Sequence, residues 1–271
     1  MQTAISILVF AMMLVVGSGL VTERQDLKMR TGKTAALVGA QLLLPLLVLL
    51  IGGLMGMAEP LLLALVVIAL CPGGTVSNFY THLAKGAVLL SVTLTTLSGL
   101  LFVALAILAS LVLSPIDSAL AFTATGQLLF FLLAPLLLGV AAARQYPAWA
   151  GKVRPYLEFA IGIGLIVVVA KLIIDHHGLA RDWGVQMWLG CTLFTLGAMG
   201  LGKLTAVTAG LNRDESVAVV VEFPCRNLAL ATYLALILGL AQEVVLMTAI
   251  CFCTQLPLLG AYVASKRRLI S

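Results

Sequence analysis

Charged residues are scarce in this chain. Of its 271 residues, 10% are Asp, Glu, Lys or Arg and 62% are hydrophobic. Since about a quarter of the residues of a soluble domain are charged, a sizeable soluble domain is excluded. The formal net charge is +5, but the basic residues lie in short segments between apolar runs and form no basic domain. Nucleic-acid binding is therefore excluded as well.

The sequence also lacks the common motifs of enzymes and metal sites. Its five cysteines form no C-x-x-C pair, so neither a zinc site nor a redox motif is indicated. We assign no metal to the three histidines, His82, His176 and His177. No Ser-His-Asp set, paired carboxylate or G-x-x-x-x-G-K-[ST] phosphate-binding motif occurs. We therefore predict that the chain is not an enzyme, has no organic cofactor and is not driven by nucleotide hydrolysis.

Long apolar runs make up most of the chain instead. A helix needs about 20 apolar residues to cross a bilayer, and nine segments of suitable length are present. The sequence predicts an all-α polytopic membrane protein with about nine transmembrane helices, surrounded by the lipid bilayer. The nine segments are residues 3–21, 34–54, 58–83, 87–113, 120–142, 156–174, 185–208, 215–237 and 243–264.

The basic residues predict the orientation in the membrane. Two of the sixteen lysines and arginines, Lys171 and Arg181, lie at one set of helix ends, and Arg226 lies within an apolar segment. The positive-inside rule places the N-terminus outside and the C-terminus in the cytoplasm. The short loops suggest a bacterial inner membrane. The remaining thirteen lie at the other set of helix ends: Arg24, Lys28, Arg30, Lys33, Lys85, Arg144, Lys152, Arg154, Lys203, Arg213, Lys266, Arg267 and Arg268.

Two apolar segments are interrupted by residues that break helices. The run CPGGTVSN occupies 71–78, and VEFPCRNL occupies 221–228. Proline and glycine disfavour a regular helix, and unwound backbone is tolerated in a membrane only where it is buried in protein or lines a cavity. Each interruption lies in the middle one of three consecutive segments. This arrangement predicts inverted repeats with two crossing discontinuous helices and a substrate site near the midplane.

Glu222 in the second interruption needs a partner. A formal charge near the bilayer centre costs about 2.5–3.5 kcal/mol on insertion scales. A bound cation, a proton and Arg226 are all candidates. Oxygen atoms from the other segments favour an alkali cation, and Ser91 and Thr95 share one helical face because they are four residues apart. The candidate oxygen ligands come from Ser77, Asn78, Ser91 and Thr95.

These runs resemble the bile acid:sodium symporter family. The resemblance is carried by CPGGTVSN at 71–78, LAKG at 83–86, LSVTLT at 90–95 and E-x-x-x-x-N-x-A-L-A at 222–231, with Gln41 and Pro45 before them. It implies a core domain of about 34–113 and 185–264, which holds the crossing helices. It also implies a panel domain of about 3–21 and 120–174, within a single transporter unit of 1–271.

The resemblance also implies the ligand sets. One sodium site would use the positions of Ser77, Asn78, Ser91, Thr95 and Glu222. A second would use those of Gln41, Glu222, Phe223, Cys225 and Arg226, partly through backbone carbonyls. The substrate positions would be Thr75, Asn78, Arg226 and Asn227.

The chain departs from the family pattern at Arg226, where the family usually has glutamine. A guanidinium has no acceptor atom and so cannot ligate sodium. Three interpretations are open: an ion pair with Glu222, replacement of the second sodium ion, or pairing with a substrate carboxylate or sulfonate.

The function predicted from the sequence is secondary active transport by alternating access. The substrate is an organic anion that is bile-acid-like, pantoate-like or a sulfonate, coupled through at most one intact sodium site. The alternatives are a sodium-independent anion carrier or exchanger, and a channel or membrane sensor.

Overall fold

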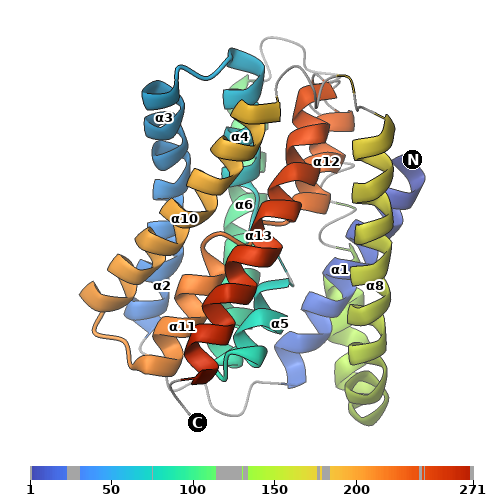
Figure 1. The fold of residues 1–271 in the computed structure, drawn as a ribbon. Coiled ribbons are helices and arrows are strands. Elements are labelled where there is room, and N and C mark those ends of the chain that lie inside the picture. The colour runs from blue at the N-terminus through green and yellow to red at the C-terminus, as the bar shows by residue number, and fades with distance from the viewer. Residues whose placement is uncertain are drawn as a thin grey trace.

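The structure is a computed structural model that describes residues 2–22, 31–74, 76–113, 130, 134–175, 178, 184–237, 240 and 242–268. Nearly all of these residues are helical (Figure 1). The named helices are α1 (Gln2–Thr22), α2 (Thr31–Ala40), η2 (Gln41–Leu43), α3 (Leu44–Met55), α4 (Glu59–Leu70), α5 (Val76–Leu83), α6 (Val88–Leu113), α8 (Pro147–Asp175), α10 (Gly184–Thr208), α11 (Arg213–Glu222), α12 (Leu228–Ile237) and α13 (Gln242–Arg268).

The helices coincide with the predicted apolar segments, which confirms the helical class. Only 130 and 134–142 of the predicted segment 120–142 are described, and 134–142 is helical. Among the described residues, three helices are long and apolar enough to cross a membrane: Lys33–Met55, Gly184–Thr208 and Gln242–Lys266. Large apolar side chains are exposed on several helices, for example Leu54 and Val185, each 81% exposed. Such surfaces suit contact with lipid, because water would penalise them.

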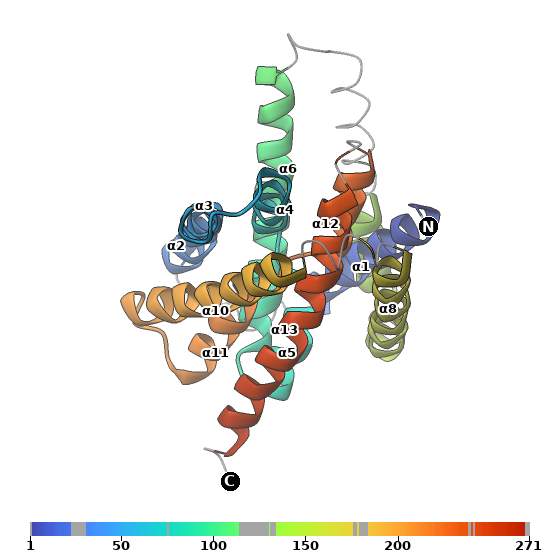
Figure 2. The same cartoon turned by 45° about the horizontal axis from the view of Figure 1, so that its top comes forward.

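The interrupted helices lie in the middle of the bundle. Helices α2 and α3 are on one side of them, and α1 and α8, which pack against each other, are on the opposite side (Figures 1 and 2). Helix α10 packs on both α11 and α13. Helix α1 begins in the upper part of the view and α13 ends in its lower part (Figure 1).

Both predicted interruptions are present, and each satisfies the backbone groups that the other leaves free. Helix α4 ends at Leu70, and α11 ends at Glu222. An antiparallel bridge then joins Gly73 to Arg226. Gly74 N–H donates to the Cys225 carbonyl and Asn227 N–H to the Pro72 carbonyl, both at 2.8 Å. The crossing is therefore a short two-stranded element, which makes unwound backbone tolerable inside a membrane protein.

Gly73 is required by the close approach at this crossing. A Cβ atom there would collide with the Glu222 carboxylate and would lie 3.3 Å from Thr95 Cα. Its backbone N–H donates to Ser98 Oγ at 3.0 Å. Only a residue without a side chain allows α6 and the carboxylate to approach the first interruption so closely.

The segment 34–54, predicted as a helix, is helical over Lys33–Met55 and contains the 3₁₀ turn η2. Pro45 has no N–H to donate to the Gln41 carbonyl, as residue i+4 of an α-helix would. The N–H of Leu44 donates to the Gln41 carbonyl instead, in the i→i+3 pattern of a 3₁₀ turn. The tightened turn occurs where Gln41 faces the crossing.

The start of α11 is held by a capping box. Asn212 Oδ1 accepts from Glu215 N–H, and Glu215 Oε2 accepts from Asn212 N–H, each at 3.0 Å. Ala87 N–H, just before α6, donates to the Asp214 carbonyl at 2.9 Å. These contacts fix α11 against the start of α6, and so bring Glu222 to the hydroxyl groups of α6.

Candidate functional site

Glu222 is fully buried at the end of α11 and accepts three side-chain hydrogen bonds. Ser77 Oγ donates to Oε2 at 2.5 Å, and Ser91 Oγ donates to the same oxygen at 3.0 Å. Thr95 Oγ1 donates to Oε1 at 2.7 Å. Three hydroxyl groups from two other helices therefore surround one carboxylate, as hydrogen bonding of a buried carboxylate requires.

The positions of these hydroxyl groups follow from local structure. Ser77 lies in the first turn of α5, and its Oγ is also 2.7 Å from the Gly74 carbonyl, a second acceptor for its one proton. Ser91 and Thr95 are one turn apart on α6 and point the same way, as their spacing predicts. Thr93, between them, donates to the Leu89 carbonyl of its own helix and does not reach the site.

Ser98 continues this face of α6 and was missed by the sequence interpretation. Its Oγ accepts from Gly73 N–H and donates to the Thr95 carbonyl, both at 3.0 Å. A signal was present, because Ser91, Thr95 and Ser98 follow the i, i+4, i+7 pattern of one helical face. Ser98 holds the first interruption rather than the carboxylate.

Asn78 supplies a further oxygen. Its side chain is buried, and its Oδ1 has no hydrogen-bond partner in the part of the chain that the structure describes. A buried acceptor without a partner is costly unless something outside the chain satisfies it. The carboxylate and the three hydroxyl oxygens form the type of donor set that hard cations prefer, and Asn78, next to Ser77 in sequence, has an unpaired amide oxygen.

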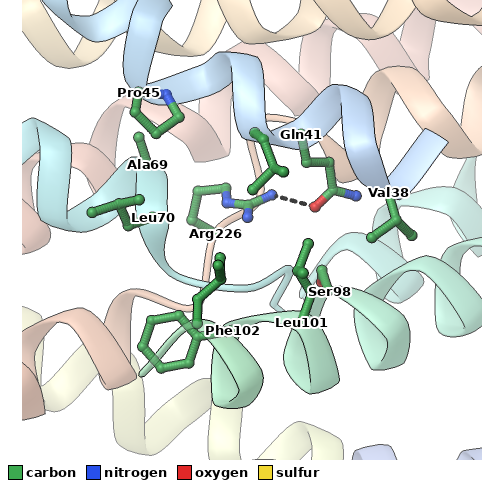
Figure 3. Close-up of a pocket in the computed structure, with 11 residues that line it drawn as sticks. Val38, Gln41, Pro45, Ala69, Leu70, Ser98, Leu101, Phe102 and Arg226 are labelled. Carbon is green, nitrogen blue, oxygen red and sulfur yellow. Dashed lines mark hydrogen bonds between the residues drawn. The ribbon is translucent and has the colours of Figure 1, made fainter. Parts of the chain in front are cut away.

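Arg226 lies on the other strand of the crossing and binds neutral oxygen atoms. Its Nη1 donates to Gln41 Oε1 at 2.9 Å (Figure 3). Its Nε donates to the Cys71 carbonyl at 2.8 Å, and Nη2 donates to the same oxygen. Among the described residues, no salt bridge joins Arg226 to Glu222. The ion pair that the sequence left open is therefore not formed in this structure.

Of the residues predicted for a second sodium site, Gln41 is hydrogen-bonded to this arginine. Gln41 Oε1 and the Cys225 carbonyl already accept hydrogen bonds, from Arg226 and Gly74 N–H respectively. Phe223 is fully buried beside them in sequence. The guanidinium thus hydrogen-bonds to oxygen atoms of the kind that would ligate a metal cation.

The second interruption has a further support that sequence reasoning did not identify as functional. Gln255 in α13 is buried, and its Nε2 donates to the Pro224 carbonyl at 2.9 Å. This bond satisfies a carbonyl freed by the break. The sequence signal for Gln255 was a polar side chain in an apolar helix, but the neighbouring residues did not indicate its hydrogen-bond partner.

The predicted substrate residues are placed in part. Asn227 is fully buried; its Oδ1 accepts from Leu230 N–H at 3.0 Å, and its Nδ2 has no partner among the described residues. Asn78 and Asn227 thus each have one unpaired polar atom near the start of the half-helices α5 and α12. Thr75 lies outside the described residues.

Residues 6–179 match the model of the Sodium Bile acid symporter family. The chain belongs to the sodium bile acid symporter family. Members of this family are transporters, which confirms the prediction that the chain is not an enzyme.

In the part of the chain that is described, no group of three or more His, Cys, Asp or Glu residues could hold a metal ion. His82 is exposed, and His176 and His177 lie outside the described residues.

Three curated relatives are similar over much of the chain. A probable sodium/metabolite cotransporter of rice (Oryza sativa) chloroplasts is 27% identical over 81% of this chain and 55% of its own length. The human ileal sodium/bile acid cotransporter is 27% identical over 61% of the chain and 49% of its own length. An uncharacterized sodium-dependent transporter of Bacillus subtilis is 23% identical over 84% and 73%. The chain spans about half the length of the rice and human proteins.

Proposed function

We propose that this chain is a secondary transporter that couples the movement of an organic anion to sodium at Glu222. The observation that carries the proposal is the group of hydroxyl oxygens around this buried carboxylate, with the unpaired Asn78 Oδ1 nearby in sequence. A sodium ion would bind Glu222 and the lone pairs of Ser77, Ser91 and Thr95, and it would satisfy Asn78. Three relatives whose names include sodium coupling support this choice of ion.

Arg226 then replaces a second sodium ion. Its positive charge is fixed among Gln41 Oε1 and the Cys71 carbonyl, and a guanidinium keeps its charge in proteins. A mobile cation beside it would be repelled. The transporter therefore couples to at most one sodium ion per cycle. A sodium-independent anion carrier is the limiting case, in which Arg226 supplies the only positive charge needed.

The architecture that suits this mechanism is a pair of inverted repeats. The core would comprise 34–113 and 185–264, and the panel would comprise 3–21 and 120–174. The packing of α1 on α8, to one side of the crossing, supports this division. In our proposal the core rocks against the panel, and nine crossings place the N-terminus outside.

A cysteine label at Ser271 should react only from the cytoplasmic side; labelling from outside would overturn this orientation.

The transported anion would bind where the half-helices α5 and α12 begin. Helix N-termini attract anions through their unpaired N–H groups and the helix dipole. Asn227 Nδ2 is a free donor at this point, and Asn78, Thr75 and Arg226 complete the predicted set. Bile-acid-like, pantoate-like and sulfonate anions all have the required charge. A thermal-shift screen of taurocholate, pantoate and alkanesulfonates, with and without sodium, would narrow the class.

The central test is Glu222→Ala in purified protein and proteoliposomes. Sodium should raise the unfolding midpoint of the wild type by about 2–4 °C at concentrations well above its dissociation constant. The variant should lose this shift, and sodium-dependent counterflow of the anion found in the screen should be abolished. Glu59→Ala, which changes an exposed carboxylate, should behave as wild type. Equal sodium responses of the wild type and Glu222→Ala would refute the assignment, and flux without counterflow would indicate a channel.

A further inference from the structure

Arg226 forms the base of a pocket on the side of the bundle that carries α2 and α3. The pocket lies between the α2–η2–α3 segment, the end of α4 and the middle of α6 (Figure 3). Its walls are apolar and include Val38, Pro45, Leu101 and Phe102. Helices α1 and α8 lie on the opposite side of the molecule (Figure 2). This pocket is therefore remote from the face that the proposed panel would cover.

The mouth of the pocket opens on the apolar outer surface of the bundle. Three leucines at its edge are partly exposed: Leu42 by 46%, Leu70 by 48% and Leu105 by 38%. In a membrane such an apolar surface faces the hydrocarbon of the lipids, where a polar group would find no water to hydrogen-bond. A molecule that reaches the pocket from this side must first dissolve in the bilayer, so it has an apolar portion.

The base of the pocket offers unpaired hydrogen-bond donors. Three of the five N–H groups of the Arg226 guanidinium are used in hydrogen bonds to Gln41 and Cys71. Gln41 Nε2 has no hydrogen-bond partner among the described residues. Ser98 Oγ already donates to Thr95 and accepts from Gly73. Unpaired donors therefore remain at two side chains, which are only 6% (Arg226) and 3% (Gln41) exposed.

The charge at this base is also not neutralised by contact. Both partners of Arg226 are neutral oxygen atoms, and no carboxylate forms a salt bridge with it within the described ranges. An intramembrane arginine is expensive without a partner. A guanidinium with free N–H groups binds carboxylate and sulfonate oxygens through charge-assisted hydrogen bonds.

We propose that this pocket binds the carboxylate or sulfonate head of an amphipathic organic anion. The head would pair with Arg226 and Gln41 Nε2, and an alkyl portion would lie along Val38, Leu101 and Phe102 toward the membrane. The pocket is small: its hollow has about 20 Å³ of space for water-sized molecules, so it would take the head, and the alkyl portion would lie along the open side. A slender alkyl chain suits this space better than a fused ring system.

This site goes beyond the proposed sodium coupling, because its ligand would bind Arg226 and Gln41, which share no hydrogen-bond partner with Glu222. It shares Arg226 with the predicted substrate set, so it is the sodium assignment that can fail independently of it. A ligand on Arg226 would also touch the crossing itself, since the backbone of Arg226 is bridged to Gly73. Occupancy is therefore expected to stabilise the crossing and the fold as a whole.

The test is thermal unfolding of the full chain in lipid nanodiscs, in potassium buffer without sodium. Potassium octanesulfonate should raise the unfolding midpoint by about 2–4 °C at saturation, whereas octanol, which has the same chain without the charge, should not. Arg226→Gln should weaken the response about tenfold or more, as expected for loss of a charged hydrogen-bond donor. Glu222→Ala should lose the sodium response and keep the octanesulfonate response.

A second variant tests the pocket without removing the charge. Leu105→Trp fills the mouth and should abolish the octanesulfonate shift, while Leu108→Trp should keep it. Leu108 is on the same helix and 57% exposed but does not line the pocket. An undiminished shift in Leu105→Trp, an equal shift with octanol, or no shift in the wild type would each overturn the proposal. None of these results would affect the sodium assignment at Glu222.

Discussion

Glu222 and Arg226 are four residues apart, yet they have opposite surroundings. Glu222 accepts from the hydroxyl groups of Ser77, Ser91 and Thr95. Arg226 donates to Gln41 and to the Cys71 carbonyl. Each charge thus has hydrogen-bond partners of suitable polarity, but neither has an opposite charge in contact among the described residues. In the two proposals, each charged group binds a mobile counter-ion: a cation at Glu222 and an anion at Arg226.

The helix break is what separates the two charges. In a regular α-helix, residues i and i+4 are neighbours on one face, and a glutamate and an arginine at this spacing form an ion pair. Here α11 ends at Glu222, and Arg226 lies in the extended strand that is bridged to Gly73. The two side chains therefore have different hydrogen-bond partners: hydroxyl groups of α5 and α6 for Glu222, and Gln41 and the Cys71 carbonyl for Arg226. Unwinding between them creates two charged sites from what would otherwise be one neutral pair.

The comparison predicts the largest effect for Arg226→Gln. The change removes the fixed positive charge and gives the glutamine that the family resemblance implies at this position. Sodium dependence of uptake should become steeper, with the Hill coefficient rising from about 1 toward 2 as a second ion binds. Arg213→Gln, at an exposed arginine that bonds the Lys266 carbonyl, should leave it unchanged.

Calorimetry of sodium binding to both proteins provides the decisive count for this prediction. One ion per wild-type chain and two per Arg226→Gln chain are expected. A wild-type chain that binds two sodium ions would defeat the idea that Arg226 takes the place of one. The comparison of the two charges would then have to be abandoned, because the arginine side would also attract cations.

A smaller effect is expected for Thr95→Val, which sharpens the Glu222 half of the comparison. Thr95 and Thr96 are both buried on α6, but Thr96 Oγ1 donates to the Val92 carbonyl of its own helix at 2.9 Å. Thr95→Val removes a charged hydrogen bond and should cost about 1.5–3 kcal/mol of stability. It should also weaken sodium binding about tenfold, if a ligand worth about 1.4 kcal/mol is lost.

Thr96→Val is the matched control, because it deletes a hydroxyl of the same type one position away. It should change sodium affinity by less than about twofold, as its hydroxyl does not face the carboxylate. Equal losses of sodium affinity in the two variants would show that the hydroxyl of Thr95 has no special role. Thermal unfolding with a sodium titration gives both quantities for both proteins.

Much of this arrangement was predictable from local sequence. The breaks follow from Pro72 and Pro224 with their neighbouring residues, because proline removes a backbone donor wherever it occurs. The grouping of Ser91 with Thr95 follows from helical spacing. The helix expected over 34–54 is present as Lys33–Met55, but the 3₁₀ turn at Gln41–Leu43 was not predicted, although Pro45 is in the sequence.

The sequence by itself determined the helical membrane class, the two break positions and the presence of a buried carboxylate and a buried guanidinium. Only the tertiary structure decided that they do not pair, that Ser98 and Gln255 hold the unwound backbone, and that Arg226 closes a pocket. The physical reason is that periodicity and propensity act over a few residues. The partners of the unwound segments are backbone carbonyls and side chains 25 to 185 positions away. Which of them meet depends on how the helices pack.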